Sequence, residues 1–252
     1  MELKLDDSIP RRVLIIVAHQ DDIEFGCAGS VARWKQGGAE VVYAILTDGS
    51  SGSDDPTMGK VELMRLREQE QCEAAQVLGV TDVRFFRLPD GELQPTMELR
   101  REIVKLIREV KPDRIVCQDP TTVFVRGTYI NHPDHRAAGQ VVIDAIFPAS
   151  QAPLIFPDLL AAGYEPHTVY EVYLMLTNEA DTAIDISSTL EAKMAALACH
   201  RSQLGTDSLD WIRERNAEIG TQAGVPYAEV YRVMHINQRR AADASPTEER
   251  NG

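Results

Sequence analysis

The sequence predicts an α/β protein, a Rossmann-like three-layer sandwich with a mainly parallel sheet and an α+β embellishment at its C-terminal end. Strand-like and helix-like segments alternate from the start of the chain to residue 147, which is the pattern of βαβ units. The strand-like segments are continuous apolar runs rich in β-branched residues, as expected of parallel strands covered on both faces. With 252 residues, the chain is long enough to bury such a sheet in one domain.

The first part of the chain contains four expected strands, and each is followed by an expected helix. The apolar runs predict strands at residues 13–18, 41–46, 83–87 and 115–117. The helical pattern predicts helices at residues 24–36, 61–78, 96–110 and 135–147. Glycines mark two of the helix ends, at Gly37 with Gly38 and at Gly79, because glycine readily adopts the left-handed conformation that closes a helix.

The pattern becomes mixed beyond residue 147. The proline-containing stretch 149–166 predicts a long surface excursion. Further strands are expected at 169–176 and 230–236, and further helices at 190–201 and 209–219. The polar tail, residues 238–252, is expected to be disordered, so residues 1–237 are predicted to form a single domain.

The charge of the chain excludes two classes of partner. There are 39 acidic and 26 basic residues, which gives a formal net charge of −13. Binding to nucleic acid or to an anionic membrane surface needs a basic face that displaces counterions. We therefore expect neither nucleic acid nor membrane as a partner.

The N-terminal region and the cysteines predict a cytoplasmic protein. The first ten residues are acidic and lack an apolar core, so no signal peptide is expected. The apolar run from Val13 to Ala18 has six residues, too few to cross a bilayer. The four cysteines form no C-x-x-C pair and are read as reduced side chains.

The first candidate site is the segment from Ala18 to Glu24, which follows the first expected strand. Ligands of open α/β sheets bind at the carboxyl ends of the strands. The adjacent carboxylates Asp21 and Asp22 repel each other there, and a cation would compensate for them. An imidazole, His19, beside a carboxylate suits Zn²⁺ or Fe²⁺ better than Ca²⁺ or Mg²⁺. The alternative is that these acids only cap the following helix.

The second candidate site is the segment Asn131-His132-Pro133-Asp134-His135, which follows the fourth expected strand. Two histidines and an aspartate within four positions form a compact group of metal ligands or acid and base groups. The alternative is a solvated helix start with incidental histidines. Since the chain has only six histidines, their occurrence beside aspartates at two strand ends favours one shared site.

These residues carry a family resemblance. The sequence resembles the LmbE-like, or PIG-L, family of zinc-dependent N-deacetylases, which act on N-acetylglucosamine linked to inositol, malate or another sugar. Residues 18–24 match its A-H-P-D-D-x-E signature except that Gln20 replaces proline, and residues 132–135 match its H-P-D-H signature. The likeness continues through an R-x-x-E helix at Arg67, through residues 88–93, and through a helix that contains His200.

The resemblance implies a metal site made by His19, Asp22 and His135. The family's metal is zinc, and Fe²⁺ or another divalent transition metal is the alternative. Three protein ligands leave a position open for water, as in catalytic zinc sites. The implied reaction is hydrolysis of the acetamide of an N-acetylglucosamine-type small molecule to acetate and a free amine. The family is often oligomeric, so a homo-oligomer is a further expectation, with the apolar stretch 147–160 as a candidate interface.

The resemblance also implies catalytic roles for three other residues. Asp21 is the expected general base toward water. His132 is expected to stabilise the oxyanion or to protonate the leaving amine, and Asp134 to orient and charge His132. Arg67 matches the family's substrate-contacting arginine. The alternative, that it is simply a charged residue on an exposed helix face, fits the sequence equally well.

Two further residues receive expectations without a catalytic role. Glu24 is expected to face solvent or to support the first turn of its helix. His200 is expected to be packed or hydrogen bonded rather than to bind a metal.

Three other functions are weighed against this one. A nucleotide-binding oxidoreductase or methyltransferase is disfavoured because the glycines are not spaced as G-x-G-x-x-G and because Asp21 and Asp22 would repel a pyrophosphate. A metal-dependent phosphoesterase would need the ligands of a two-metal site. A non-enzymatic α/β interaction domain with a structural metal is the remaining alternative, and metal content distinguishes it.

Overall fold

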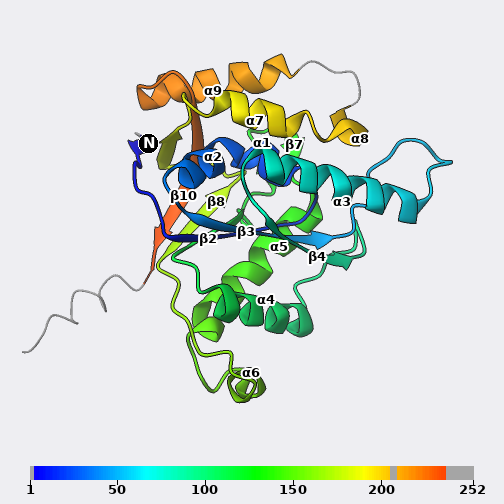
Figure 1. Cartoon of the computed structure of the whole chain (residues 1–252), viewed down its shortest axis with the longest axis vertical. Helices are drawn as coiled ribbons and strands as arrows, with labels where there is room; N and C mark the ends of the chain where they lie inside the picture. The colour runs from blue at the N-terminus through cyan, green and yellow to red at the C-terminus, as the bar shows by residue number, and fades with distance from the viewer. Residues whose placement is uncertain (1–2, 205–208, 237–252) are drawn as a thin grey trace, which may run out of the picture.

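The protein is built around one large, twisted sheet (Figure 1). The computed structural model describes residues 3–204 and 209–236. Within these residues the sheet has eight strands in the order β1-β9-β10-β8-β5-β2-β3-β4. Their bounds are β1 Lys4–Leu5, β2 Arg12–Val17, β3 Glu40–Thr47, β4 Asp82–Leu88, β5 Arg114–Gln118, β8 Glu171–Met175, β9 Thr182–Asp185 and β10 Ala228–His235.

The sheet is mainly parallel, as the sequence predicts. Strands β4, β3, β2, β5 and β8 run in one direction, and β1 is parallel to its neighbour β9. Only β10, which lies between β8 and β9, is antiparallel to both neighbours. The carboxyl ends of β2 and β5, two adjacent parallel strands, therefore meet at the same edge of the sheet.

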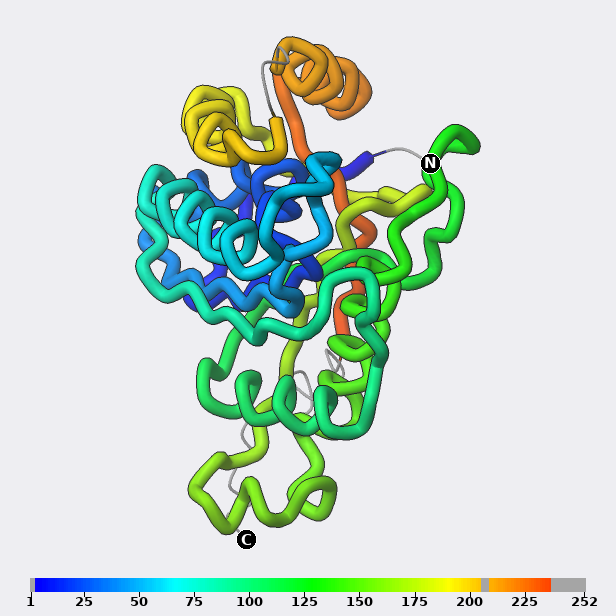
Figure 2. Tube along the Cα trace, turned by 90° about the vertical axis from the view of Figure 1, so that its right-hand side faces the viewer, coloured from blue at the N-terminus to red at the C-terminus, as the bar shows by residue number. Residues whose placement is uncertain are grey.

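Helices cover both faces of the sheet, which confirms the three-layer arrangement (Figure 1). One layer contains α1 Asp22–Gly26, α2 Ala28–Gln36, α3 Lys60–Val77, α7 Leu190–Leu197, α8 Arg201–Leu204 and α9 Asp210–Ala223. The other contains α4 Met97–Val110 and α5 Pro133–Asp144. Figure 2 shows the segment around α6 Pro157–Ala161 at the end of the molecule away from α9. No described helix is both long and apolar enough to cross a membrane.

The central strand β2 contributes side chains to two hydrophobic cores, one on each face of the sheet. Its alternate residues Val13, Ile15 and Val17 belong to the core on one side of the sheet, whereas Leu14 and Ile16 belong to the core on the other. All five are fully buried. Because side chains alternate between the faces of a strand, a strand covered on both faces needs apolar residues at every position.

Several expected elements begin, end or divide differently in the structure. The expected helix 24–36 is divided at Cys27, whose φ of −147° is not helical, into α1 and α2. The expected helix 135–147 begins earlier, at Pro133, and α5 ends at Asp144. A π-helical segment, Ala145–Ser150, follows, and Phe147 within it is extended at φ −132° before Pro148. Proline disfavours the helical conformation of the preceding residue.

Other elements lie where no element was expected. The excursion at 149–166 contains α6. The expected helix 190–201 is shorter in the structure, since α7 ends at Leu197, and the separate α8 begins at Arg201. Strands β1 and β9 and the small hairpin of β6 Phe124–Val125 and β7 Tyr129–Ile130 were not predicted. Strands of two to four residues contain too few positions to show a period of two. The expected disorder of residues 238–252 concerns residues outside those that the structure describes.

Candidate metal centre

The two predicted segments meet at the carboxyl edge of the sheet. His19 follows β2, and His135 lies in the first turn of α5, which follows β5 and the β6–β7 hairpin. The two rings are 116 positions apart in the chain, yet His19 Nδ1 lies 3.2 Å from His135 Nε2. The neighbouring parallel strands β2 and β5 produce this meeting because both end at this edge.

Asp22 completes a group of three possible metal ligands. One atom each from His19, Asp22 and His135 lies within 4.8 Å of the others. Asp22 Oδ1 is 3.0 Å from His135 Nε2, and Asp22 Oδ2 is 3.6 Å from His19 Nδ1. Two imidazoles and one carboxylate are a donor set that suits zinc and related transition metals. The sequence-predicted ligand set therefore converges and fits a single ion.

Neighbouring groups orient these ligands. Asn131 Oδ1 lies 3.0 Å from His135 Nδ1, so that nitrogen donates, and Nε2 is the ring nitrogen that faces Asp22 and could bind an ion. Asp22 Oδ2 accepts hydrogen bonds from Gln118 Nε2 at 2.7 Å and from the His19 backbone N–H at 2.7 Å. Such outer contacts fix the tautomer of a histidine and the rotamer of a carboxylate before an ion binds.

The electrostatics of the group favour a cation. Burial lowers the pKa of the His19 ring, but the carboxylates of Asp134, Asp22 and Asp90 raise it, and the pKa lies well above its usual range. Burial raises the pKa of Asp22, yet the rings of His135 and His19 hold it well below its usual range. The carboxylates thus stabilise positive charge at this position, which a proton on His19 supplies and which a metal ion can supply instead.

Asp21 lies next to the ligand group, in an unusual backbone conformation. Its φ is 94°, in the left-handed region that residues other than glycine rarely adopt. Its backbone N–H donates to Gln71 Oε1 at 3.1 Å, and its Oδ2 lies 3.4 Å from Arg67 Nη2. Burial raises the pKa of Asp21 to about 6, opposed by the Arg67 cation and reinforced by Asp22.

The imidazole of His132 lies beside the ligand group and is oriented by the backbone. Its ring centroid is 4.7 Å from that of His19. His132 Nδ1 accepts the backbone N–H of Asp134 at 3.2 Å, so a neutral ring carries its proton on Nε2. Burial and the His19 charge lower the pKa of His132, which favours this neutral form.

The carboxylate of Asp134 faces His19. It accepts the backbone N–H groups of Gly91 at 2.7 Å and of Leu93 at 3.2 Å, and it lies 3.4 Å from His19 Nε2. Among the described contacts, Asp134 hydrogen bonds to His132 through its backbone N–H and not through its carboxylate. His19, His132 and Asp134 also form a second possible ligand group, which shares His19 with the first.

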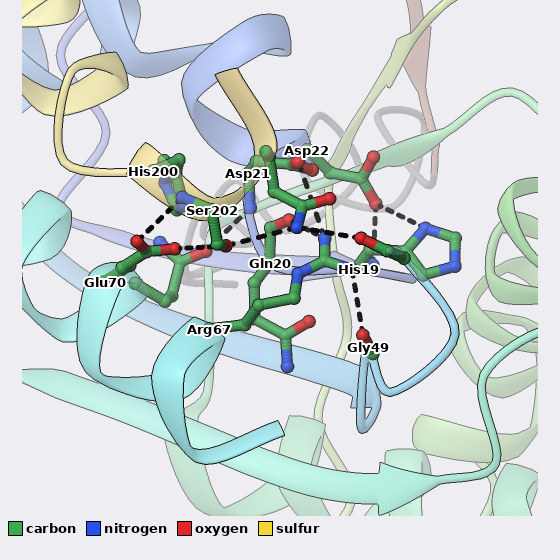
Figure 3. A network of polar contacts seen from close by, with 12 residues as sticks. His19, Gln20, Asp21, Asp22, Gly49, Arg67, Glu70, His200 and Ser202 are labelled. Carbon is green, nitrogen blue, oxygen red and sulfur yellow. Dashed lines mark hydrogen bonds and ion pairs between the residues drawn. The ribbon is translucent and has the colours of Figure 1, made fainter. Parts of the chain in front are cut away.

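Arg67 is buried, contrary to the interpretation as an exposed residue on a helix face. Only 3% of it is exposed, and it lies on the face of helix α3 that also buries Leu63 and Glu70. Its Nη2 donates to Gln20 O at 2.7 Å and its Nη1 donates to Gly49 O at 3.1 Å (Figure 3). Arg67 thus joins the loops that follow β2 and β3. These bonds hold the loop in which Gln20 occupies the position of the family's proline.

The sequence matches a known family over the part of the chain that contains this site. Residues 14–146 match the family model described as PIG-L, GlcNAc-PI de-N-acetylase. The chain belongs to the PIG-L family. This PIG-L protein is 34% identical to the diacetylchitobiose deacetylase of Thermococcus kodakarensis over 228 residues, which cover 89% of this chain and 83% of the relative.

Two further comparisons bear on fold and reaction. The structure of N,N'-diacetylchitobiose deacetylase from Pyrococcus horikoshii, determined with an inhibitor, superposes with a TM-score of 0.83 at 30% identity and covers 92% of this chain and 89% of that one. GalB, the 4-carboxy-2-hydroxymuconate hydratase of Pseudomonas putida KT2440, superposes with a TM-score of 0.71 at 20% identity, with 89% and 96% covered. Since a hydratase shares the PIG-L fold, the reaction must be argued from the site.

Asp90 is a residue of this PIG-L site that motif spacing did not identify. Its Oδ1 lies 3.1 Å from His19 Nε2, and its Oδ2 accepts the Ser51 backbone N–H at 2.9 Å. Burial raises the pKa of Asp90, but the His19 hydrogen bond and the Ser51 N–H lower it to about 2. The resemblance at residues 88–93 was the available signal, but no local pattern connects Asp90 with a histidine 71 positions earlier.

Of the two expectations for Glu24, exposure to solvent is wrong, whereas its position in the first turn of α1 is as expected. Glu24 is fully buried, because α1 packs against α2 and α7 and because Gln71 of α3 reaches its carboxylate. Its Oε2 lies 3.0 Å from His200 Nε2, and both of its oxygens accept from Gln71 Nε2, at 3.1 and 3.2 Å. A buried carboxylate needs such partners to replace water. The expectation that His200 is hydrogen bonded is confirmed.

The acidic side chain of Glu70 extends this network toward α8. Its carboxylate accepts from the backbone N–H of Ser202 at 2.9 Å and from the Ser202 hydroxyl at 2.6 Å (Figure 3). With the His200 contact, these bonds join the C-terminal part of the PIG-L chain to the helix that carries Arg67.

Proposed function

We propose that this PIG-L protein is a metal-dependent N-deacetylase, which hydrolyses the acetamide of an N-acetylglucosamine-type small molecule to acetate and a free amine. The observation that carries the proposal is the convergence of His19, Asp22 and His135 at the carboxyl edge of the sheet. Asp21 lies next to this group but is not one of its three possible ligands. The named deacetylases among the similar proteins support the same reaction.

We propose that His19, Asp22 and His135 hold the ion and that the ion is Zn²⁺, with Fe²⁺ as the alternative. The two nitrogens and the carboxylate match the ligands of catalytic zinc sites, which keep one position open. When bound there, the ion supplies Lewis-acid chemistry that makes water acidic and polarises the amide carbonyl. The second group, which contains His132 and Asp134, shares His19 with the first and therefore does not supply an independent second ion of the kind that a two-metal phosphoesterase needs.

Asp21 is proposed to take the proton from the attacking water. The carboxylate is close to the ligands and buried, and its raised pKa keeps it basic enough to accept a proton near neutral pH. The water oxygen then bonds to the acetyl carbon, the carbon–nitrogen bond breaks, and a proton is delivered to the nitrogen that leaves as an amine.

His132 is proposed to donate from Nε2, either to the oxyanion of the tetrahedral intermediate or to the leaving nitrogen. The Asp134 N–H occupies Nδ1, so the proton of the neutral ring lies on the other nitrogen.

Arg67 is proposed to contact substrate. Its two hydrogen bonds to loop carbonyls fix the guanidinium, and its Nε is buried without a hydrogen bond among the described residues.

Two finer expectations accompany this function. We propose that the protein is cytoplasmic, since its four cysteines are free thiols, which suits a reducing compartment. We also propose a homo-oligomer that uses the 147–160 stretch, where Phe147 is 60% and Leu154 is 87% exposed. Sedimentation of wild-type protein and of Leu154→Glu tests the interface, and cell fractionation tests the compartment.

An acetate-release assay tests the reaction. The purified protein is incubated with N,N'-diacetylchitobiose, an inositol glycoside and simple aryl glycosides of N-acetylglucosamine, with and without a chelator. We expect acetate in equal amounts to free amine, loss of release with the chelator, and recovery on addition of Zn²⁺. Metal-loaded protein that releases acetate from none of them would contradict the proposal and favour the non-enzymatic interaction domain.

A further inference from the structure

A large cavity lies beside the metal ligands and extends away from them toward α9. Its volume is about 620 Å³, and Asp22 and His135 line one end. Two aromatic side chains that are about half exposed, Tyr129 and Trp211, line it as well. A cavity of this size holds more than an acetamide group, so the rest of the substrate occupies it under the proposed function.

Two arginines, Arg126 and Arg215, also line this cavity. Arg126 is exposed and lies in the turn between β6 and β7. Its backbone N–H donates to Asn178 Oδ1 at 3.0 Å, and Asn178 Nδ2 donates to Phe124 O at 2.6 Å. The hairpin is therefore tied to the chain that follows β8, which holds the base of the Arg126 side chain beside the cavity.

Arg215 lies on α9, lines the same cavity and is half-buried. Among the described residues, its guanidinium has neither an ion pair within 4.0 Å nor a hydrogen bond. Arg213, two positions earlier on the same helix, differs: it holds both carboxylate oxygens of Glu191, at 2.5 and 2.7 Å. The Glu191 carboxylate thus neutralises the charge of Arg213, whereas no carboxylate of the described residues forms an ion pair with Arg215.

The surroundings of Arg215 disfavour its positive charge, because the side chain is half-buried and a second cation is close by. Burial lowers the pKa of Arg215, and the charge of Arg126 lowers it further, whereas Glu229 acts in the opposite direction. Glu229 is itself engaged by Lys193 at 2.6 Å. Glu214 and Glu218 line the exposed rim of the cavity, but neither forms an ion pair with either arginine among the described contacts. Two mutually repelling cations at one cavity are stabilised when an anion binds between them.

We propose that Arg126 and Arg215 form a subsite for an anionic group, a carboxylate or a phosphate, on the part of the substrate that is linked to the amino sugar. This inference rests on the proposed deacetylation and specifies the substrate class. A guanidinium binds either group with two parallel N–H donors, which an ammonium cannot do. Trp211 and Tyr129 provide apolar surface in the same cavity for the sugar ring or for the linking atoms.

Matched synthetic substrates test the subsite. They are the para-carbamoylphenyl, para-carboxyphenyl and para-phosphonophenyl glycosides of N-acetylglucosamine, in both anomers, assayed by acetate release at low salt. The first is neutral and nearly isosteric with the second, so their comparison isolates the charge. We expect kcat/KM for the better anionic substrate to exceed that for the neutral one about tenfold or more, since hydrogen bonds between charged groups are worth more than neutral ones. The order of the carboxylate and the phosphonate identifies the anion.

Substitutions assign the preference to the two arginines. Arg215→Gln and Arg126→Gln are each expected to remove most of the anionic preference by raising KM for the anionic substrate. Arg126→Gln changes an exposed residue, so its effect does not depend on the folding of a half-buried variant. Arg213→Gln is the matched control, and it is expected to keep the wild-type preference. Far-UV circular dichroism and thermal melting compare the folding of all three.

The outcomes separate the two proposals. Turnover of the neutral glycoside with no preference for either anion, or a preference that survives both substitutions, would overturn the subsite and leave the deacetylase intact. A preference for the neutral over the anionic glycosides would show that Glu214 and Glu218 decide the charge of the cavity instead. Failure to deacetylate any of the three would count against the proposed function itself.

Discussion

Gln71 holds the backbone of Asp21: its side-chain oxygen accepts the Asp21 N–H at 3.1 Å. The amide nitrogen of the same side chain donates to Glu24, which in turn contacts His200. The left-handed conformation of Asp21 is therefore supported by a buried chain of hydrogen bonds that begins on α3 and reaches the segment between α7 and α8. This chain of hydrogen bonds holds the proposed base and includes none of the three proposed metal ligands.

Asp21→Asn is expected to retain the metal and to lose activity. The amide preserves the shape of the side chain and leaves His19, Asp22 and His135 unchanged, but it cannot accept the proton from water. General-base catalysis contributes about 10²- to 10⁴-fold, and kcat should fall by that order. Bound zinc is measured by elemental analysis beside the rate. Turnover near the wild-type value would exclude Asp21 as the base.

His135→Ala is expected to lose both zinc and activity, because one of three protein ligands is removed. Metal content after dialysis and the rate of acetate release are measured together. His235→Ala is the matched control, since that imidazole is exposed and lies on β10, outside the ligand group. If His135→Ala keeps one zinc per chain, the proposed ligand set is wrong.

Gln71→Leu tests the positioning of the base. We expect kcat to fall at least tenfold with little change in KM or in bound zinc, because the substitution leaves the ligands in place. The free energy of unfolding should decrease by about 1–3 kcal/mol, since the Asp21 N–H and the Glu24 carboxylate each lose a buried partner. Gln69→Leu is the control on the same helix, because Gln69 is exposed and its side-chain amide donates to Glu73 rather than to the site. Equal losses in kcat for the two variants would contradict a positioning role for Gln71.

The His200 contact predicts a pH-dependent contribution to stability. Burial lowers the pKa of His200, but Glu24 raises it, with smaller contributions from Asp21 and Glu70, so the pKa lies above its usual value. A group whose pKa is raised on folding stabilises the fold fully below its unfolded pKa of about 6.5, and this stabilisation is lost as the pH rises through the folded pKa.

Urea unfolding of wild-type protein and His200→Gln, at the same metal loading, measures this effect. The wild-type advantage in free energy of unfolding should be larger at pH 6 than at pH 9. His235→Gln, at a ring that is about half exposed on β10, is the control for the substitution itself. An advantage that grows with pH would mean that His200 is neutral in the folded protein.

Local sequence patterns were sufficient for much of the fold and for the candidate ligands. The run 13–18 predicts β2 because a strand covered on both faces requires apolar residues throughout. His19 and Asp22 could be found because they directly follow that strand, and His135 because its motif begins a helix after β5. In each case the signal lies within a few adjacent residues. The division of a helix at Cys27 and the short strands β1 and β9 were not predictable in this way, since tertiary packing determines them.

By itself, the sequence determined the alternation of strands and helices, the excess of acidic residues, and the histidines and aspartates that could share one ion. The tertiary structure alone decided which charged side chains are buried and with what partners. Glu24 meets a histidine 176 positions away, and Arg67 reaches loop carbonyls 47 and 18 positions away. The tertiary structure also placed Asp90 against His19, and Arg126 with Arg215 at one cavity. The physical reason is that burial of a charge depends on its neighbours in space, whereas propensity and periodicity report only neighbours along the chain.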